Sequence, residues 1–189
     1  MRPAAARPQA RAATTPSRSA VLEALTAGAL PPLLGAPLAE AAVLGCVLLA
    51  GPDVARDVLH RLTSEDWTVP VHAHVAAAAT VLLERGEPVD PVTVLGQLRR
   101  QGLEDARTAS RDTGVLLVEL CQSAPCTSSA RHYVQIVLEH SYRRRVQQAA
   151  VRLLHASDAG SLDDLAVVIG REHAALLDCQ QRIGATRHA

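Results

Sequence analysis

Two histidines separated by a single alanine, His72 and His74, are of a residue type that could bind a metal ion. The alanine-rich segment around them predicts a helix, on which residues two apart point about 200° away from each other. The two imidazoles could not easily share one ion, so we expect them to be structural or exposed. Cys121 and Cys126 flank Pro125 at a wider spacing than a zinc knuckle needs. The sequence therefore predicts no metal site and no bound cofactor.

The motifs of nucleotide-dependent and hydrolytic enzymes are missing. The chain contains no lysine, which excludes a P-loop nucleotide site, and no Gly-x-Gly-x-x-Gly or Gly-x-Ser-x-Gly run occurs. The acidic residues are scattered over predicted helix faces, and no pair of carboxylates has a reason to be buried. The cysteines lie in apolar segments that predict helices, so we expect small buried side chains in a reducing compartment at Cys46, Cys121, Cys126 and Cys179. The sequence therefore predicts that this chain is not an enzyme.

A run of arginines is the one concentrated feature with binding chemistry. Arg143, Arg144 and Arg145 are consecutive, and Arg152 follows on the same predicted helix. Neighbouring residues on a helix lie about 100° apart, so the three side chains fan out instead of forming one stripe. Contact with nucleic-acid phosphates is one interpretation, and a solvated helix surface is the other. The formal net charge of zero disfavours a protein whose whole surface binds a polyanion.

The elements that position these side chains are predicted to be helices. Of the 189 residues, 48% are hydrophobic, with one Trp, two Tyr and no Phe, so a core must be built from Ala, Leu and Val. This composition favours an all-α fold. The absence of Lys, Asn and Phe, whose codons are AT-rich, indicates a bacterial gene of high GC content. No window is long and apolar enough for a membrane span, so we expect a cytoplasmic protein with no membrane contact.

Four segments are predicted along the chain. Residues 1–35 are rich in Ala, Pro and Arg and are expected to form a disordered tail. Residues 36–126 are expected to form a small orthogonal bundle of helices, and residues 127–184 a long antiparallel helical hairpin. Residues 185–189 are expected to be a disordered end. The clearest boundary between two predicted helices is Gly86–Pro91, with a glycine that ends one helix and an Asp-Pro pair that begins the next.

The predicted hairpin carries apolar residues at spacings of three and four, which is typical of a coiled-coil seam. Ser161 and Asp164 favour a capped second helix after a short polar turn, and Glu172 alone interrupts the apolar stripe of that helix. Because two helices alone make an incomplete core, we expect self-association through the seam. The alternative is that the hairpin folds back on the bundle. The predicted seam residues are Tyr142, Val146, Leu153, Leu162, Leu165, Ile169, Leu176 and Ile183.

Several short segments occur in an order that is specific to one protein family. They are Pro37–Gly45, Asp66-Trp67, Pro70–His72, Gly86–Val94, Leu117 with Leu120, Pro125, and Tyr133–Val137 followed by Arg143-Arg144. Together they resemble the N-terminal domain of DnaB-type replicative DNA helicases over about residues 36–183. The chain departs from that family at Thr68 and Ala76, where aromatic residues are usual, and at Gly114, where two glycines are usual.

The resemblance implies a fold and a class of partners. In that family the domain is a helical bundle followed by a hairpin, and paired hairpins build a ring collar that contacts primase. The family's RecA-like ATPase half has no counterpart in this sequence. We therefore expect a non-catalytic replication module that forms a homo-oligomer, as a dimer or a ring of dimers, and binds replicative helicase, primase or both. The alternatives are a detached or degenerate helicase fragment, or a protein that binds DNA weakly through its arginines.

Overall fold

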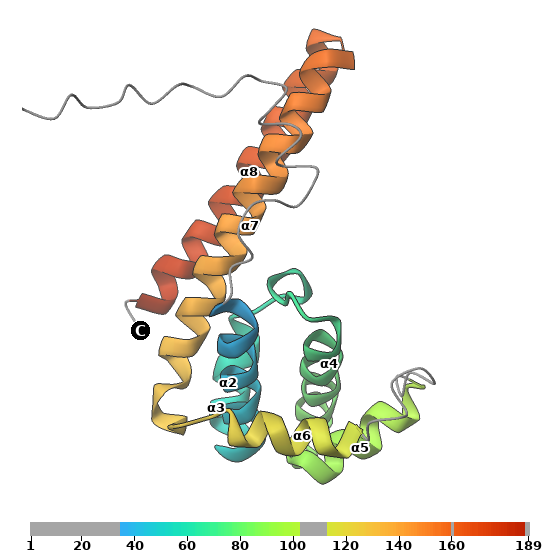
Figure 1. The fold of residues 1–189 in the computed structure, drawn as a ribbon, viewed down its shortest axis with the longest axis vertical. Helices are drawn as coiled ribbons and strands as arrows, with labels where there is room; N and C mark the ends of the chain where they lie inside the picture. Colours follow the sequence, from blue (N-terminus) through green and yellow to red (C-terminus); the bar gives the residue numbers. More distant parts are fainter. Residues whose placement is uncertain (1–34, 103–112, 160, 188–189) are drawn as a thin grey trace, which may run out of the picture. The chain divides into compact units, whose positions relative to one another are not determined.

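The computed structural model of the chain describes residues 35–102, 113–159 and 161–187, and every regular element among them is a helix (Figure 1). This confirms the predicted all-α class. The first helices form the bundle: α2 (Gly35–Leu49), α3 (Pro52–His60), the 3-10 turn η1 (Ser64–Asp66), α4 (Pro70–Glu84), α5 (Pro91–Arg100) and α6 (Thr113–Gln122). The turn η2 (Thr127–Ser129) then leads into the hairpin of α7 (Ala130–Ala159) and α8 (Leu162–Arg187).

The bundle is orthogonal, with α6 crossing the direction of α2 and α4 in Figure 1. Its core is built from valine, leucine and alanine, as the composition predicted, with Trp67 and Cys46 as the other apolar members. The largest fully buried apolar side chains come from α2 to α7: Val43, Leu44, Val47, Val58, Val75, Leu82, Val94, Leu98, Leu117, Leu120 and Leu138. The predicted tail lies outside the described residues except for Gly35, which begins α2.

The segment between α4 and α5 folds as its sequence predicted. Gly86 has φ +69°, and the amides of Gly86 and Glu87 donate to carbonyl oxygens of the last turn of α4, at 3.1 and 2.9 Å. This is the Schellman arrangement that ends a helix at glycine. The Asp90 carboxylate accepts from the amides of the second and third residues of α5, and Pro91 occupies the first helical position. Local chemistry alone therefore sets this turn.

The cap of the short turn before α4 is set by two neighbouring candidates. Ser64 also carries a hydroxyl, but Thr63 takes the cap position. The Thr63 amide and hydroxyl both donate to the Asp66 carboxylate, at 2.7 and 2.9 Å. Either hydroxyl suits a cap chemically, so the position of Asp66, three residues after Thr63, decides between them.

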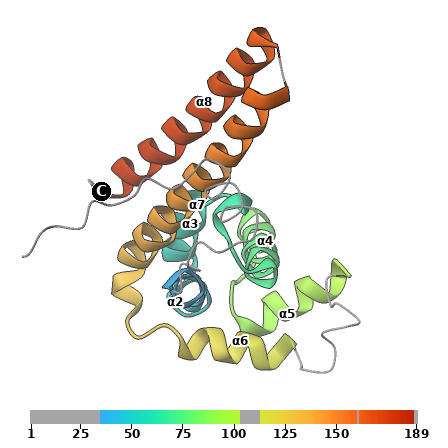
Figure 2. The same ribbon diagram turned by 45° about the horizontal axis from the view of Figure 1, so that its top comes forward.

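In the hairpin, α7 and α8 lie side by side and antiparallel in both views (Figures 1 and 2). The predicted cap of α8 is present, since Ser161 and Asp164 exchange hydrogen bonds between each side chain and the other's amide, at 3.2 Å each. The expected disordered end of 185–189 is wrong for residues 185–187, because α8 continues to Arg187. Thr186 is buried and Ile183 packs against the core of the bundle, so tertiary contacts hold these last turns. Within the described residues no helix is suited to crossing a bilayer.

Candidate protein-interaction surface

The predicted seam residues do not all face the same way. Tyr142, Leu153, Leu165 and Leu176 are half-buried, and Ile183 packs against the bundle. By contrast, Leu162 is 85% exposed, Ile169 49% and Val146 41%. The stripe that looks continuous in the sequence therefore divides into one part that closes the hairpin and another that remains on its surface.

Two of these exposed residues, Leu162 and Ile169, belong to a stripe along the outer side of α8. Leu162, Ala166, Ile169, His173 and Leu177 are all exposed, and their spacings of four and three place them within an arc of about 80°. Leu177, at 41% exposure, was missing from the predicted seam although its spacing from Ile169 could have revealed it. We call these five residues the outer stripe. It carries neither acidic nor arginine side chains.

The inner face of α8 is marked by three buried residues at intervals of seven, Glu172, Cys179 and Thr186. Glu172 was predicted only as a break in the apolar seam. Its carboxylate accepts hydrogen bonds from Arg152 on α7, at 2.8 and 2.7 Å, and from Arg171. The two guanidinium groups hold the pKa of Glu172 below its usual value. This ion pair therefore joins the two helices of the hairpin.

Asp66 joins the bundle to both helices of the hairpin. Its carboxylate is buried and accepts from the Ser141 hydroxyl of α7 at 2.6 Å and from the Arg182 guanidinium of α8 at 2.6 Å. The Thr63 amide and hydroxyl complete the shell. Burial would raise the pKa of this carboxyl, but the hydrogen bonds from Arg182, Ser141 and Thr63 outweigh it and hold the pKa below its usual value. The charged carboxylate thus fixes the end of α8 on the bundle.

Glu40 makes a second buried junction, between α2 and α4. Its side chain is completely buried and accepts from the amides of Thr68 and Val69, at 2.7 and 3.2 Å, just before α4 begins. The His72 ring nitrogen Nδ1 lies 2.8 Å from the same carboxylate. Burial would raise the pKa of Glu40, but the bonds from His72, Thr68 and Val69 outweigh it and lower that pKa. His72 is therefore structural, as expected, and His74 is exposed.

Sequence reasoning missed three buried acids and misplaced one cysteine. Glu40, Asp66 and Glu172 are each buried beside donors from other elements of the fold. A lone acid inside the apolar run of α2 was the one local signal that could have pointed to Glu40. Among the cysteines, Cys46 and Cys179 are buried and Cys121 is half-buried, but Cys126 is exposed. Cys126 lies in the link between α6 and η2, where no helix face turns it inward.

The arginine run is placed close to the bundle. Arg144 donates to the Thr68 hydroxyl at 2.9 Å and to the Glu65 carbonyl oxygen at 2.6 Å, and Arg145 pairs with the Glu65 carboxylate at 2.7 Å. Arg152 pairs with Glu172, as described above, and Arg143 is exposed. Three of the four guanidinium groups thus already bind acceptors within the chain. Contact of Arg143, Arg144, Arg145 and Arg152 with nucleic acid stays a prediction.

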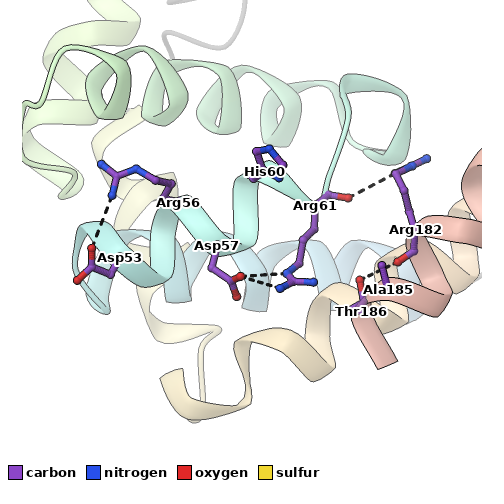
Figure 3. A pocket seen from close by; sticks show the side chains of 8 residues that line it. All are labelled: Asp53, Arg56, Asp57, His60, Arg61, Arg182, Ala185 and Thr186. Carbon is purple, nitrogen blue, oxygen red and sulfur yellow. Dashed lines mark hydrogen bonds and ion pairs between the residues drawn. The ribbon is translucent and has the colours of Figure 1, made fainter. Parts of the chain in front are cut away.

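A groove of about 690 Å³ lies between α3 and the end of α8 (Figure 3). The Arg61 guanidinium in it pairs with the Asp57 carboxylate at 2.7 Å. Its one hydroxyl, that of Thr186, donates to the carbonyl oxygen of Arg182, so the lining offers no activated nucleophile. The part of the chain that the structure describes also contains no group of three or more side chains able to hold a metal ion. The lining residues are Asp53, Arg56, Asp57, His60, Arg61, Arg182, Ala185 and Thr186.

Comparison with known protein families gives one assignment for the whole bundle and the start of the hairpin. Residues 35–139 match the family described as the DnaB-like helicase N-terminal domain. Among solved structures, the N-terminal domain of DnaB helicase from Mycobacterium tuberculosis is 36% identical, with a TM-score of 0.63. That similarity covers 75% of this chain and 95% of the solved one.

Two curated relatives carry helicase names. Replicative DNA helicase DnaB of Mycobacterium leprae is 38% identical over 142 residues, which is 74% of this chain and 22% of that protein. Replicative DNA helicase DnaC of Bacillus subtilis is 32% identical over 127 residues, which is 67% of this chain and 26% of that protein. The chain therefore spans about a quarter of the length of these two helicases.

Proposed function

Because this chain belongs to the family of DnaB-like helicase N-terminal domains, we propose that it is a non-catalytic interaction module of bacterial DNA replication. It works in the cytoplasm, associates with itself through the hairpin, and binds the replicative helicase, its primase or both. The family assignment supports the replication context, since the curated relatives are named as replicative helicases. If the chain acts together with a helicase motor, the hairpin surfaces would build the ring collar of that helicase.

The outer stripe of α8 is the observation that carries self-association. Leu162, Ile169 and Leu177 are large apolar side chains that remain exposed on one side of a 26-residue helix. Large apolar side chains that gather on one exposed side of a helix are typical of an interaction site. Ala166 lies between them and Gly170 beside them, and such small residues let a second helix approach closely.

A second copy of the chain is the occupant that this stripe suits best. The outer stripe carries no acidic or arginine side chain that would need an oppositely charged partner. The same apolar stripe on a second copy is therefore complementary to it. Two copies related by a two-fold axis would bury both stripes at once, which is the commonest symmetry of soluble oligomers.

A pair of charged substitutions in the stripe tests this interface. Ile169→Asp with Leu177→Asp should convert a dimer into a monomer, because association would bury two unpaired carboxylates in each copy. Val92→Asp on α5 is the matched control, since Val92 is 79% exposed and lies outside the hairpin. Light scattering during size-exclusion chromatography, at one protein concentration, reads out the mass. A double variant that stays dimeric, or an unsubstituted chain that is monomeric, would contradict the proposal.

Partner binding is tested separately with purified proteins. We expect the chain to bind a DnaB-type helicase or its primase at both low and moderate salt, because apolar contacts are not screened. Fluorescence anisotropy with the labelled full chain gives the affinities. Absence of binding to either protein at either salt would contradict the partner assignment and leave self-association standing.

A further inference from the structure

Two cysteines that are distant in sequence meet where α2 passes the link between α6 and η2. The Cys46 thiol points toward the carbonyl oxygen of Cys126, with Sγ and O 3.9 Å apart. A residue's own Cα lies about 2.4 Å from its carbonyl oxygen, so the Cα of Cys126 is at most about 6.3 Å from the Cys46 sulfur. A disulfide between the two therefore requires the link to shift and the Cys126 side chain to turn from Ser128 toward α2.

Close packing at the preceding residue confirms that this link lies directly on α2. A Cβ atom added to Gly45 would overlap the Leu120 carbonyl oxygen and would lie 2.7 Å from the Cβ of Ala124. Only a glycine lets the end of α6 approach α2 so closely. The residues between α6 and η2 belong to no helix, so the link can adjust more easily than the elements it joins.

The two thiols have opposite environments. Cys126 is exposed, and its sulfur lies 2.9 Å from the Ser128 hydroxyl. Hydrogen bonds from Ser128 and Ser129 lower the pKa of the Cys126 thiol, which favours the reactive thiolate. Cys46 is completely buried, and burial raises the pKa of its thiol. One sulfur is therefore accessible to solvent reagents, and the other is protected from them.

We propose that Cys126 is a surface thiol that reacts with hydroperoxides, and that Cys46 resolves the product into an intramolecular disulfide. The Cys126 thiolate attacks one peroxide oxygen, so an S–O bond forms and the O–O bond breaks. The sulfur loses two electrons and becomes a sulfenic acid, and the other peroxide oxygen leaves as water or an alcohol after taking up a proton. The Cys46 thiol then attacks that sulfur. The S–S bond forms, and the hydroxyl leaves as water with the Cys46 proton.

The disulfide would tie the first helix of the bundle to the residue that precedes η2 and α7. Cys46 lies in the last turn of α2, and Cys126 is the last residue before the turn that starts the hairpin. The site therefore lies at the joint between the two parts of the fold. This inference does not depend on the proposed partners, because it concerns the chemistry of two thiols in one chain.

Peptide mapping of the peroxide-treated full chain tests the proposal. Trypsin cleaves after arginine here, so Cys46 falls in peptide 19–56, and both Cys121 and Cys126 fall in peptide 112–131. The Cys121→Ser variant removes that ambiguity and serves as the background. After hydrogen peroxide and alkylation of free thiols, we expect the two peptides to be disulfide-linked, and dithiothreitol to separate them. The Cys179 peptide should remain reduced, because its thiol is buried.

Two further variants separate the roles of the two thiols. Cys126→Ser replaces an exposed side chain. In this variant, thiol oxidation in the peroxide-treated chain should fall to the level seen without peroxide. Cys46→Ala should prevent the disulfide and leave a sulfenic acid on Cys126 that dimedone traps. Circular dichroism checks that this variant folds. The proposal is overturned if Cys126 does not react, if its sulfenic acid persists with Cys46 present, or if Cys126 forms disulfides only between chains.

Discussion

Replacing Arg182 with methionine tests the junction at Asp66. The Asp66 side chain is completely buried and the Arg182 side chain is 19% exposed, with their atoms 2.6 Å apart. Removing one partner of a buried ion pair leaves an uncompensated charge and typically costs about 3–5 kcal/mol. Ser141 and Thr63 still donate to the carboxylate, so we expect the lower end of this range, about 3 kcal/mol.

Arg187→Met is the matched control for that substitution. Arg187 lies one turn further along α8 and pairs with Glu139 of α7 at 2.8 Å, but both side chains are well exposed. An exposed pair contributes at most about 1 kcal/mol. Urea unfolding followed by circular dichroism at one protein concentration gives both differences in the free energy of unfolding. An Arg182→Met loss no larger than the control's would refute the role assigned to Asp66.

The unsubstituted chain and the Arg182→Met variant should also differ in how their stability depends on pH. The pKa of folded Asp66 is below its unfolded value of about 3.9, so its contribution to stability is complete above that value and is lost as pH falls through the folded pKa. Arg182→Met removes one cause of the lowered pKa. The difference in stability between the two proteins should therefore shrink below about pH 4. A difference that stays constant from neutral pH into acid would contradict this reasoning.

The other predictions concern α2 and α5 and are measured by thermal unfolding. Gly45→Ala should lower the melting temperature, because its Cβ would overlap the Leu120 carbonyl oxygen, whereas Gly96→Ala, with open space around it, should stabilise α5 by up to about 1 kcal/mol. The reverse order would show that the close approach at Gly45 is not needed. Glu40→Gln should cost about 1–3 kcal/mol at neutral pH, because the fold favours the charged carboxylate over the neutral form. An unchanged melting temperature would show that this charge stabilises nothing.

Family membership and local structure were predictable from the sequence because short-range chemistry encodes them. Gly86, Asp90 and Pro91 act through atoms only a few residues away, and the structure reproduces each of their roles. The all-α class follows from a core of small aliphatic residues. Helical spacing also showed that the hairpin carries apolar stripes. These features depend on residues whose neighbours in space are neighbours in sequence.

The tertiary structure decided which side chains those elements bring together. Asp66 finds Arg182 at a separation of 116 residues, and Glu40 finds His72 at a separation of 32. Nothing local to either acid reveals a donor so distant. On α8, Leu162 and Ile169 lie exposed while Leu165, which belongs to the same repeat of three and four residues, is half-buried. Periodicity defines the faces of a helix, and only the packing of neighbouring helices determines which face is covered.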